Sequence, residues 1–166
     1  MRSPTRKDLI RNIIFVFAVP GVVGGLFPWL ITRYRAYDWG RWDQLLGVAA
    51  CALIVLGVLV LLHGVWRFAT DGRGTPSPTA PTQALVVEGP YRYVRNPMYM
   101  AVGAVIFGQV LLFFTWGLVA YLALFVLAVV AFVKAYEEPT LRRTFGAEYD
   151  EYRARVPGWF PRPPRD

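Results

Sequence analysis

The sequence predicts an all-α, polytopic membrane protein with four transmembrane helices, and its composition and charge pattern carry that prediction. Hydrophobic residues make up 55% of the 166 residues and charged residues only 17%, which is too apolar for an ordinary soluble domain of this length. Long windows of the chain lack Asp, Glu, Lys and Arg altogether. Helices that are apolar on every side have no face to turn toward water, which disfavours the alternative of a soluble protein with buried helices. We therefore expect a single membrane domain over residues 1–166.

The spans follow from the lengths of the uncharged windows, because a helix needs about 20 apolar residues to cross a ~30 Å hydrocarbon core. The uncharged run from Asn96 to Val133 has 38 residues and would be about 57 Å long as one helix. Two spans joined by a tight turn near Thr115-Trp116-Gly117 fit this run better. The four expected spans are about 13–31, 45–66, 98–114 and 117–133.

The distribution of basic residues predicts the orientation. Fifteen of the 18 Lys and Arg residues lie before the first span, in the loop 67–97 or in the tail 134–166. Because basic residues accumulate on the cytoplasmic side, we expect both termini, this loop and the tail to be cytoplasmic, at a plasma (inner) membrane. The net charge of +7 would then attract anionic membrane lipids. With no soluble basic module in the chain, we expect no nucleic acid partner.

Several residues within the spans have expected structural roles. Pro20 and Pro28 should kink the first span, a distortion that membrane helices tolerate. Gln109 is the only strongly polar side chain deep in the third span, and we expect it to form a hydrogen bond to another helix. With one cysteine, Cys51, and one histidine, His63, the chain can form neither an intrachain disulfide nor a histidine metal cluster, and we expect no metal site. Close helix packing is expected at two pairs of small residues, Gly21/Gly25 and Ala104/Gly108.

The loop before the third span contains two different stretches. Residues 70–82 are rich in Gly and Pro, which excludes a regular helix. Further on, a short helix over 90–95 would put Arg92 and Arg95 on one face. The third span should begin with a capping residue and a first-turn proline, Asn96 and Pro97.

The tail has the pattern of one C-terminal amphipathic helix that ends before Pro157. Pro139 should interrupt the helix that leaves the membrane and restart it, with Glu138 near the new N-terminus. The apolar residues recur at spacings of three and four and form one stripe, Leu141, Phe145, Tyr149, Tyr152 and Val156.

The tight turn between the last two spans predicts a functional site. It brings Asn96 and Glu137 to the same depth on the same side, so that arginines, carboxylates and aromatic side chains meet near the Gly-rich loop 71–74. Such a pocket would suit a polar cofactor that carries both charge signs, next to an opening toward the lipid. The alternative is that interfacial Arg and Tyr only anchor the helices and that Glu137 and Glu138 are solvated charges.

The chain resembles the superfamily of isoprenylcysteine carboxyl methyltransferases and phospholipid N-methyltransferases, which are integral membrane enzymes. The resemblance covers the chain from about Gly72 onward. It is carried by Gly89-Pro-Tyr-Arg-Tyr-Val-Arg-Asn-Pro-Met-Tyr99, Glu137-Glu138, Phe145-Gly-Ala-Glu-Tyr149-Asp-Glu-Tyr152 and Val156-Pro157. It implies S-adenosylmethionine as the cofactor and a lipid or lipid-like substrate that enters from the bilayer.

The resemblance also implies roles for individual residues. Arg95 and Glu138 would be catalytic, with Glu137 as a further candidate. Many members have His where this chain has Asn96, and Asn cannot act as a base at neutral pH. A carboxylate substrate would need a cation such as Arg95, whereas an amine would need a proton acceptor, Glu138 or Glu137. The candidate cofactor-binding residues are Gly72, Gly74, Tyr91, Arg92, Asn96, Pro97, Tyr99, Tyr149 and Tyr152.

Two other classes of function remain open at this point. The chain could be an NADPH-dependent membrane reductase, because sterol-reductase-like proteins have a related cytoplasmic tail. It could also be a non-catalytic membrane scaffold. The sequence leaves the identity of the substrate and the oligomeric state undetermined.

Overall fold

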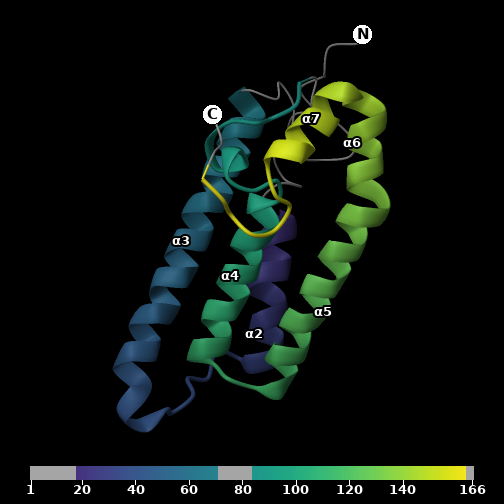
Figure 1. The fold of residues 1–166 in the computed structure, drawn as a ribbon. Helices are drawn as coiled ribbons and strands as arrows, with labels where there is room; N and C mark the ends of the chain where they lie inside the picture. Colours follow the sequence, from purple (N-terminus) through teal and green to yellow (C-terminus); the bar gives the residue numbers. More distant parts are fainter. Residues whose placement is uncertain (1–17, 71–83, 164–166) are drawn as a thin grey trace.

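The computed structural model describes residues 18–70 and 84–163, which form helices and no strands (Figure 1). The all-α prediction is confirmed for this part of the chain. In chain order the helical segments are the first helix Ala18–Thr32, which contains η1 (Val22–Leu26) and α2 (Phe27–Thr32), then η2 (Gly40–Trp42), α3 (Asp43–Thr70), η3 (Gly89–Arg92), α4 (Pro97–Leu112), α5 (Trp116–Phe132), η4 (Val133–Glu137), α6 (Glu138–Phe145) and α7 (Ala147–Arg155).

Two helical runs are long and apolar enough to cross a membrane, Gly40–Arg67 and Trp116–Phe145. Two shorter apolar helices, Ala18–Thr32 and Pro97–Leu112, accompany them. These four runs overlap the four expected spans, apart from the part of the first span that lies outside the described residues. The last run continues past residue 133, where the fourth span is expected to end, to Phe145 in the predicted tail. The structure therefore supports a helical membrane protein, whereas four complete crossings and their orientation stay predictions.

The expected turn between the third and fourth spans is present. Helix α4 ends at Leu112 and α5 begins at Trp116, and the Thr115 hydroxyl caps α5 by accepting a hydrogen bond of 3.1 Å from the Leu118 backbone N–H. Helices α4 and α5 run antiparallel, so the start of α4 and the end of α5 lie at the same end of the molecule as α6 and α7 (Figure 1).

Helices α3 and α4 pack closely because two glycines let their backbones approach. A Cβ at Gly57 would lie 2.7 Å from the Ala101 carbonyl oxygen, and one at Gly108 would lie 2.8 Å from that of Ala50. Gly108 thus packs as its small-residue pair predicts. For Gly21, which belongs to the other predicted pair, no close packing is seen among the described residues, because none of their atoms lies within 4 Å of an added Cβ.

The first helix is held by side chains from α4 and α5. Pro28 has no backbone N–H, so the carbonyl of Gly24, four residues earlier, is left without its helical donor. Gln109 Nε2 donates to that carbonyl oxygen at 2.6 Å, and the Tyr121 hydroxyl donates to the Val23 carbonyl at 2.7 Å. The predicted interhelical hydrogen bond of Gln109 is therefore confirmed.

The C-terminal region differs from the single amphipathic helix expected after Pro139. The chain stays helical through Glu137 and Glu138, because the wider π-turn η4 precedes Pro139 and accommodates it. The break comes later, at Gly146, whose φ of 55° favours glycine. The tail therefore forms two helices, α6 and α7. Its predicted apolar stripe still forms one cluster, in which Tyr149, Tyr152 and Val156 are buried against Leu141 and Phe145.

Candidate active site

The segment that leads into α4 is fastened to the C-terminal part of the chain. Tyr91 is buried, and its carbonyl accepts a hydrogen bond of 2.8 Å from the Tyr152 hydroxyl. The backbone N–H of Arg95 donates to the Pro157 carbonyl at 2.9 Å, and Asn96 Nδ2 donates to the Gly158 carbonyl at 3.0 Å. These contacts hold Arg95 and Asn96 in place from outside their own segment.

Arg95 forms the centre of a charged cluster. Its Nη1 lies 3.0 Å from Glu138 Oε1 and donates to the Tyr149 hydroxyl at 3.0 Å. Arg153 Nη2 approaches the other carboxylate oxygen of Glu138 at 3.6 Å. The side chains of Arg95 and Glu138 are only 13% and 18% exposed. Arg95 Nε is buried and has no hydrogen-bond partner in the described structure, so a donor remains available at this point.

Glu137 belongs to a separate contact. The Tyr99 hydroxyl donates a hydrogen bond of 2.9 Å to Glu137 Oε2. Burial raises the pKa of the Glu137 carboxyl above its usual range; the Tyr99 hydrogen bond opposes this rise, and the charge of Glu138 adds to it. The expected repulsion between the adjacent glutamates is present, but burial is the larger cause.

The two neighbouring glutamates point in different directions. Successive residues of a helix are about 100° apart around its axis, so Glu138 can face Arg95 and Arg153 while Glu137 faces Tyr99. The pair therefore consists of one carboxylate between two arginines and one in contact with a neutral hydroxyl.

An apolar groove with a volume of about 270 Å³ lies between α4 and α5, next to this second carboxylate. Tyr99 lines the groove and also holds Glu137. Trp159, from the segment after α7, also lines the groove. The other lining residues are Met100, Gly103, Leu122, Phe125, Val126 and Val129.

The buried tyrosines of the site remain hydrogen-bond donors. Burial raises the pKa of Tyr91, Tyr149 and Tyr152 above the usual tyrosine value, although Arg95 lowers that of Tyr149 and Tyr152. All three hydroxyls therefore stay protonated at neutral pH, so the site's negative charge comes from its carboxylates.

The structure brings together most of the residues that the sequence singles out. Arg95, Glu138 and Tyr149 form one cluster, and Glu137 with Tyr99 forms another. Two further candidates, Asn96 and Pro97, lie at the start of α4. Pro97 is buried in the first turn of α4, and Asn96 precedes α4 but makes no side-chain cap bond, because its amide binds Gly158.

Some expectations for the site differ from the structure. Helix η3 ends at Arg92, so Arg92 and Arg95 do not share the predicted helical face; Arg92 is exposed and Arg95 is not. Gly72 and Gly74 lie outside the described residues. Three contributors to the site were not predicted from the sequence: Arg153, Gly158 and Trp159. The last two follow Val156-Pro157, which the resemblance includes, but nothing in the sequence shows that this segment folds back over α4.

The described residues contain no group of three or more His, Cys, Asp or Glu side chains that could hold a metal ion.

These features define an all-helical membrane protein with a paired arginine–glutamate cluster beside an apolar groove. The sequence matches the phospholipid methyltransferase family over residues 45–148, more than half of the chain, and the protein belongs to this family. The matched range includes Arg95, Asn96, Glu137 and Glu138, so the resemblance seen in the sequence is confirmed. Membership indicates a membrane methyltransferase.

One similar protein is the nickel-cobalt-cadmium resistance protein NccN of Alcaligenes xylosoxydans xylosoxydans. The two sequences are 33% identical over 164 residues, which cover 96% of this chain and 70% of that protein. No solved structure matches the chain.

Proposed function

We propose that the protein transfers a methyl group from S-adenosylmethionine to a lipid or lipid-like substrate at the cytoplasmic face of the membrane. One observation carries this proposal: the Arg95–Glu138 pair, 3.0 Å apart, lies beside the Tyr99–Glu137 contact at the edge of an apolar groove. A polar cofactor and a partly apolar substrate can meet at this point.

The residues of the charged cluster fit the cofactor. S-adenosylmethionine carries a carboxylate and an ammonium group, and the cluster offers Arg95 and Arg153 for the first and Glu138 for the second. Arg95 Nε, buried without a partner, is a donor that a bound acceptor would satisfy. Tyr149 adds an aromatic face, which attracts cations. When bound, the cofactor supplies a methyl group activated by its sulfonium.

Glu137 and the groove fit the other reactant. A carboxylate at the mouth of an apolar groove attracts an amine and repels another carboxylate. Glu137 can accept the proton that an amine must lose, and its raised pKa makes it a better base than an ordinary glutamate. Arg95 is assigned to the carboxylate of the cofactor, so it is not available to hold a carboxylate substrate as well. These contacts favour an amphipathic amine as the substrate.

The main contribution of these residues to the rate would be positioning. Holding two reactants in line can supply about 7–11 kcal/mol in well-oriented cases. The hydrogen bonds from Arg95 N and Asn96 Nδ2 to the segment after α7 fix the charged cluster. The Tyr99 hydroxyl fixes the carboxylate of Glu137.

The proposed topology has four crossings, both termini on the cytoplasmic side, and a location in the plasma (inner) membrane. Its support is that α6, α7 and the start of α4 lie at one end of the molecule (Figure 1), and that most basic residues lie in the segments predicted for that side. Labelling of single cysteines introduced in α7 and in the turn before α5, from each side of the membrane, tests this arrangement.

The function itself is tested by binding of radiolabelled S-adenosylmethionine to protein purified in detergent. We expect saturable binding that Arg95→Ala and Glu138→Gln each abolish. The control is Arg143→Ala, because Arg143 is exposed on the same helix as Glu138. Absence of binding by the unmodified protein, or equal binding by all variants, would refute the proposal. Binding of NADPH in its place would favour the reductase alternative.

A further inference from the structure

Two helices of the chain contain a wide π-turn at the same distance before a proline. The turn η1 (Val22–Leu26) ends two residues before Pro28, and the turn η4 (Val133–Glu137) ends two residues before Pro139. In each case the residue after the turn donates its backbone N–H to the carbonyl five residues earlier. Such turns are rare and occur mostly as single bulges inside α-helices, so their shared position needs a common cause.

The prolines provide that cause. Proline has no backbone N–H, and in a regular α-helix its ring collides with the carbonyl four residues earlier. For Pro139 that carbonyl belongs to Ala135, inside η4, and for Pro28 it belongs to Gly24, inside η1. A turn with one extra residue relieves this collision and lets the helix continue. Because the same relation recurs in two separate helices, we attribute η4 to Pro139 rather than to the local surroundings of the turn.

The wide turn η4 changes which residues face α4. On α5 the side that faces α4 carries Phe125 and Val129, which line the groove between the two helices. The buried Val133, four residues further, continues this side. In a regular helix the next residues on the same side would be those three and four positions after Val133, which are Tyr136 and Glu137.

Because η4 contains one extra residue, the two glutamates occupy this side instead. Glu137 accepts the hydrogen bond from Tyr99, and Glu138 pairs with Arg95. Tyr136 is 51% exposed. Without the extra residue, Glu138 would turn by about 100° away from Arg95.

We propose that Pro139 is a positioning residue, which holds η4 in its wide form and thereby places Glu138 beside Arg95 while Glu137 stays beside Tyr99. Pro139 contributes no polar group to the site and acts through Glu138. The consequence for catalysis rests on the proposed function, because a regular helix would remove the carboxylate assigned to the ammonium group of the cofactor. The rotation itself is a property of the fold.

The test compares three variants of the full-length protein in detergent. Pro139→Ala restores the backbone donor and should let η4 become a regular α-helix. The second variant combines Pro139→Ala with deletion of Ala135, which is exposed. This deletion removes the extra residue, so that a regular helix again directs both glutamates toward α4.

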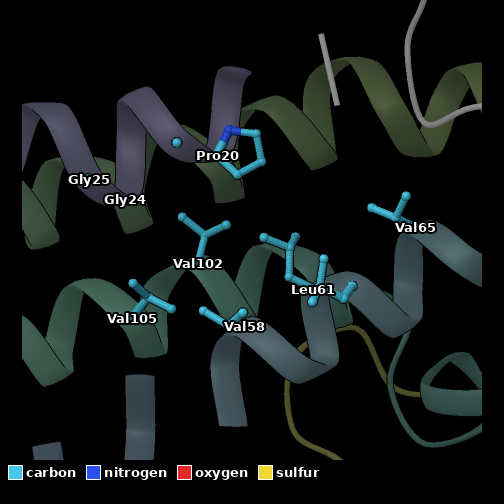
Figure 2. A pocket seen from close by; sticks show the side chains of 10 residues that line it. Pro20, Gly24, Gly25, Val58, Leu61, Val65, Val102 and Val105 are labelled. Atoms are coloured by element: carbon cyan, nitrogen blue, oxygen red, sulfur yellow. The ribbon is translucent and has the colours of Figure 1, made fainter. Parts of the chain in front are cut away.

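The matched control is Pro28→Ala, which makes the same change beside the other wide turn. Gly24 and Gly25 of that turn line an apolar groove opposite Val102 and Val105 of α4 (Figure 2). The residues that line this groove do not belong to the charged cluster.

The first measurement needs no cofactor: it is the loss of melting temperature that Glu138→Gln causes in each background. We expect this loss in the unmodified protein and with Pro28→Ala, no loss with Pro139→Ala, and the loss again once Ala135 is also deleted. The second measurement is the affinity for S-adenosylmethionine, which should fall at least about tenfold in Pro139→Ala, as for a lost hydrogen bond to a charged group. Deletion of Ala135 should restore it, whereas a proline needed only for stability would not be rescued in this way.

The proposal is overturned if Glu138→Gln has the same effect with Pro139→Ala as without it, or no effect in the unmodified protein. A loss in Pro139→Ala that deletion of Ala135 does not restore would overturn it as well. If Pro139→Ala does not fold, the variant with the deletion decides: it supports the proposal by responding to Glu138→Gln as the unmodified protein does, and it refutes the proposal by failing to fold or to respond. Absence of S-adenosylmethionine binding by the unmodified protein would refute the proposed function alone, since the melting temperatures still report the rotation.

Discussion

The substitution Glu138→Gln removes the negative charge that Arg95 and Arg153 share. It keeps a hydrogen-bond acceptor but removes the charge that faces Arg95 at 3.0 Å, where the two side chains are 13% and 18% exposed. Removing one partner of a buried pair costs about 3–5 kcal/mol. Because this pair keeps some exposure, and because a hydrogen bond to a charged group still contributes about 1.5–3 kcal/mol, we expect Glu138→Gln to lower the free energy of unfolding by about 2–3 kcal/mol.

The comparison is Arg153→Gln, which removes the other cation. Arg153 lies 3.6 Å from Glu138 and is 48% exposed, and exposed ion pairs contribute about 0–1 kcal/mol. Both variants are measured by thermal unfolding in the same detergent, with and without added S-adenosylmethionine. We expect Glu138→Gln to lose both stability and the stabilisation by the cofactor, and Arg153→Gln to keep most of its stability. Equal losses for the two variants would show that the Arg95–Glu138 pair is not the centre of the site.

Three further results are expected. Tyr99→Phe should move the acidic limb of the pH–rate profile to higher pH, because the hydroxyl lowers the pKa of Glu137 and the base is inactive once protonated; a limb that stays in place would exclude Glu137 as the base. Trp159→Ala should raise the KM for a long-tailed amine about tenfold, equivalent to about 1.4 kcal/mol, whereas Phe160→Ala, at an 81% exposed position, should not; equal effects would contradict a role for Trp159 in the groove. Gly108→Leu should lower the free energy of unfolding by about 1–3 kcal/mol, because a Cβ there meets the facing backbone of α3; an unchanged melting temperature would refute this close packing.

Hydrophobicity and turn chemistry predicted the helical content and the position of the hairpin. The uncharged run that ends at Val133 is too long for one crossing, and the structure turns at the expected place, where Thr115 caps the helix after the turn. The pairing of Arg95 with Glu138 follows from that hairpin, because it returns the chain to the same membrane depth. Periodicity could not show that the tail turns at Gly146, since the apolar stripe continues across the break and only the positive φ reveals it.

Contacts that depend on tertiary packing could not be predicted from the sequence. Gly21 has the spacing of a packing glycine but lines an open groove, and only the position of the neighbouring helices distinguishes the two cases. Arg153 likewise lies on a stretch with several arginines, and nothing local indicates that it, rather than Arg155, reaches Glu138.

The adjacent glutamates explain how one short stretch can provide two chemically different groups. Residues that follow each other in a helix must diverge by about 100°, so Glu137 and Glu138 cannot both face Arg95. The carboxylate of Glu138 lies between two arginines and contacts both of them, which suits a binding group. The carboxylate beside Tyr99 has no arginine among its recorded contacts and a raised pKa, which suits proton transfer. In the proposed reaction, this division leaves Glu137 as the group best placed to accept a proton.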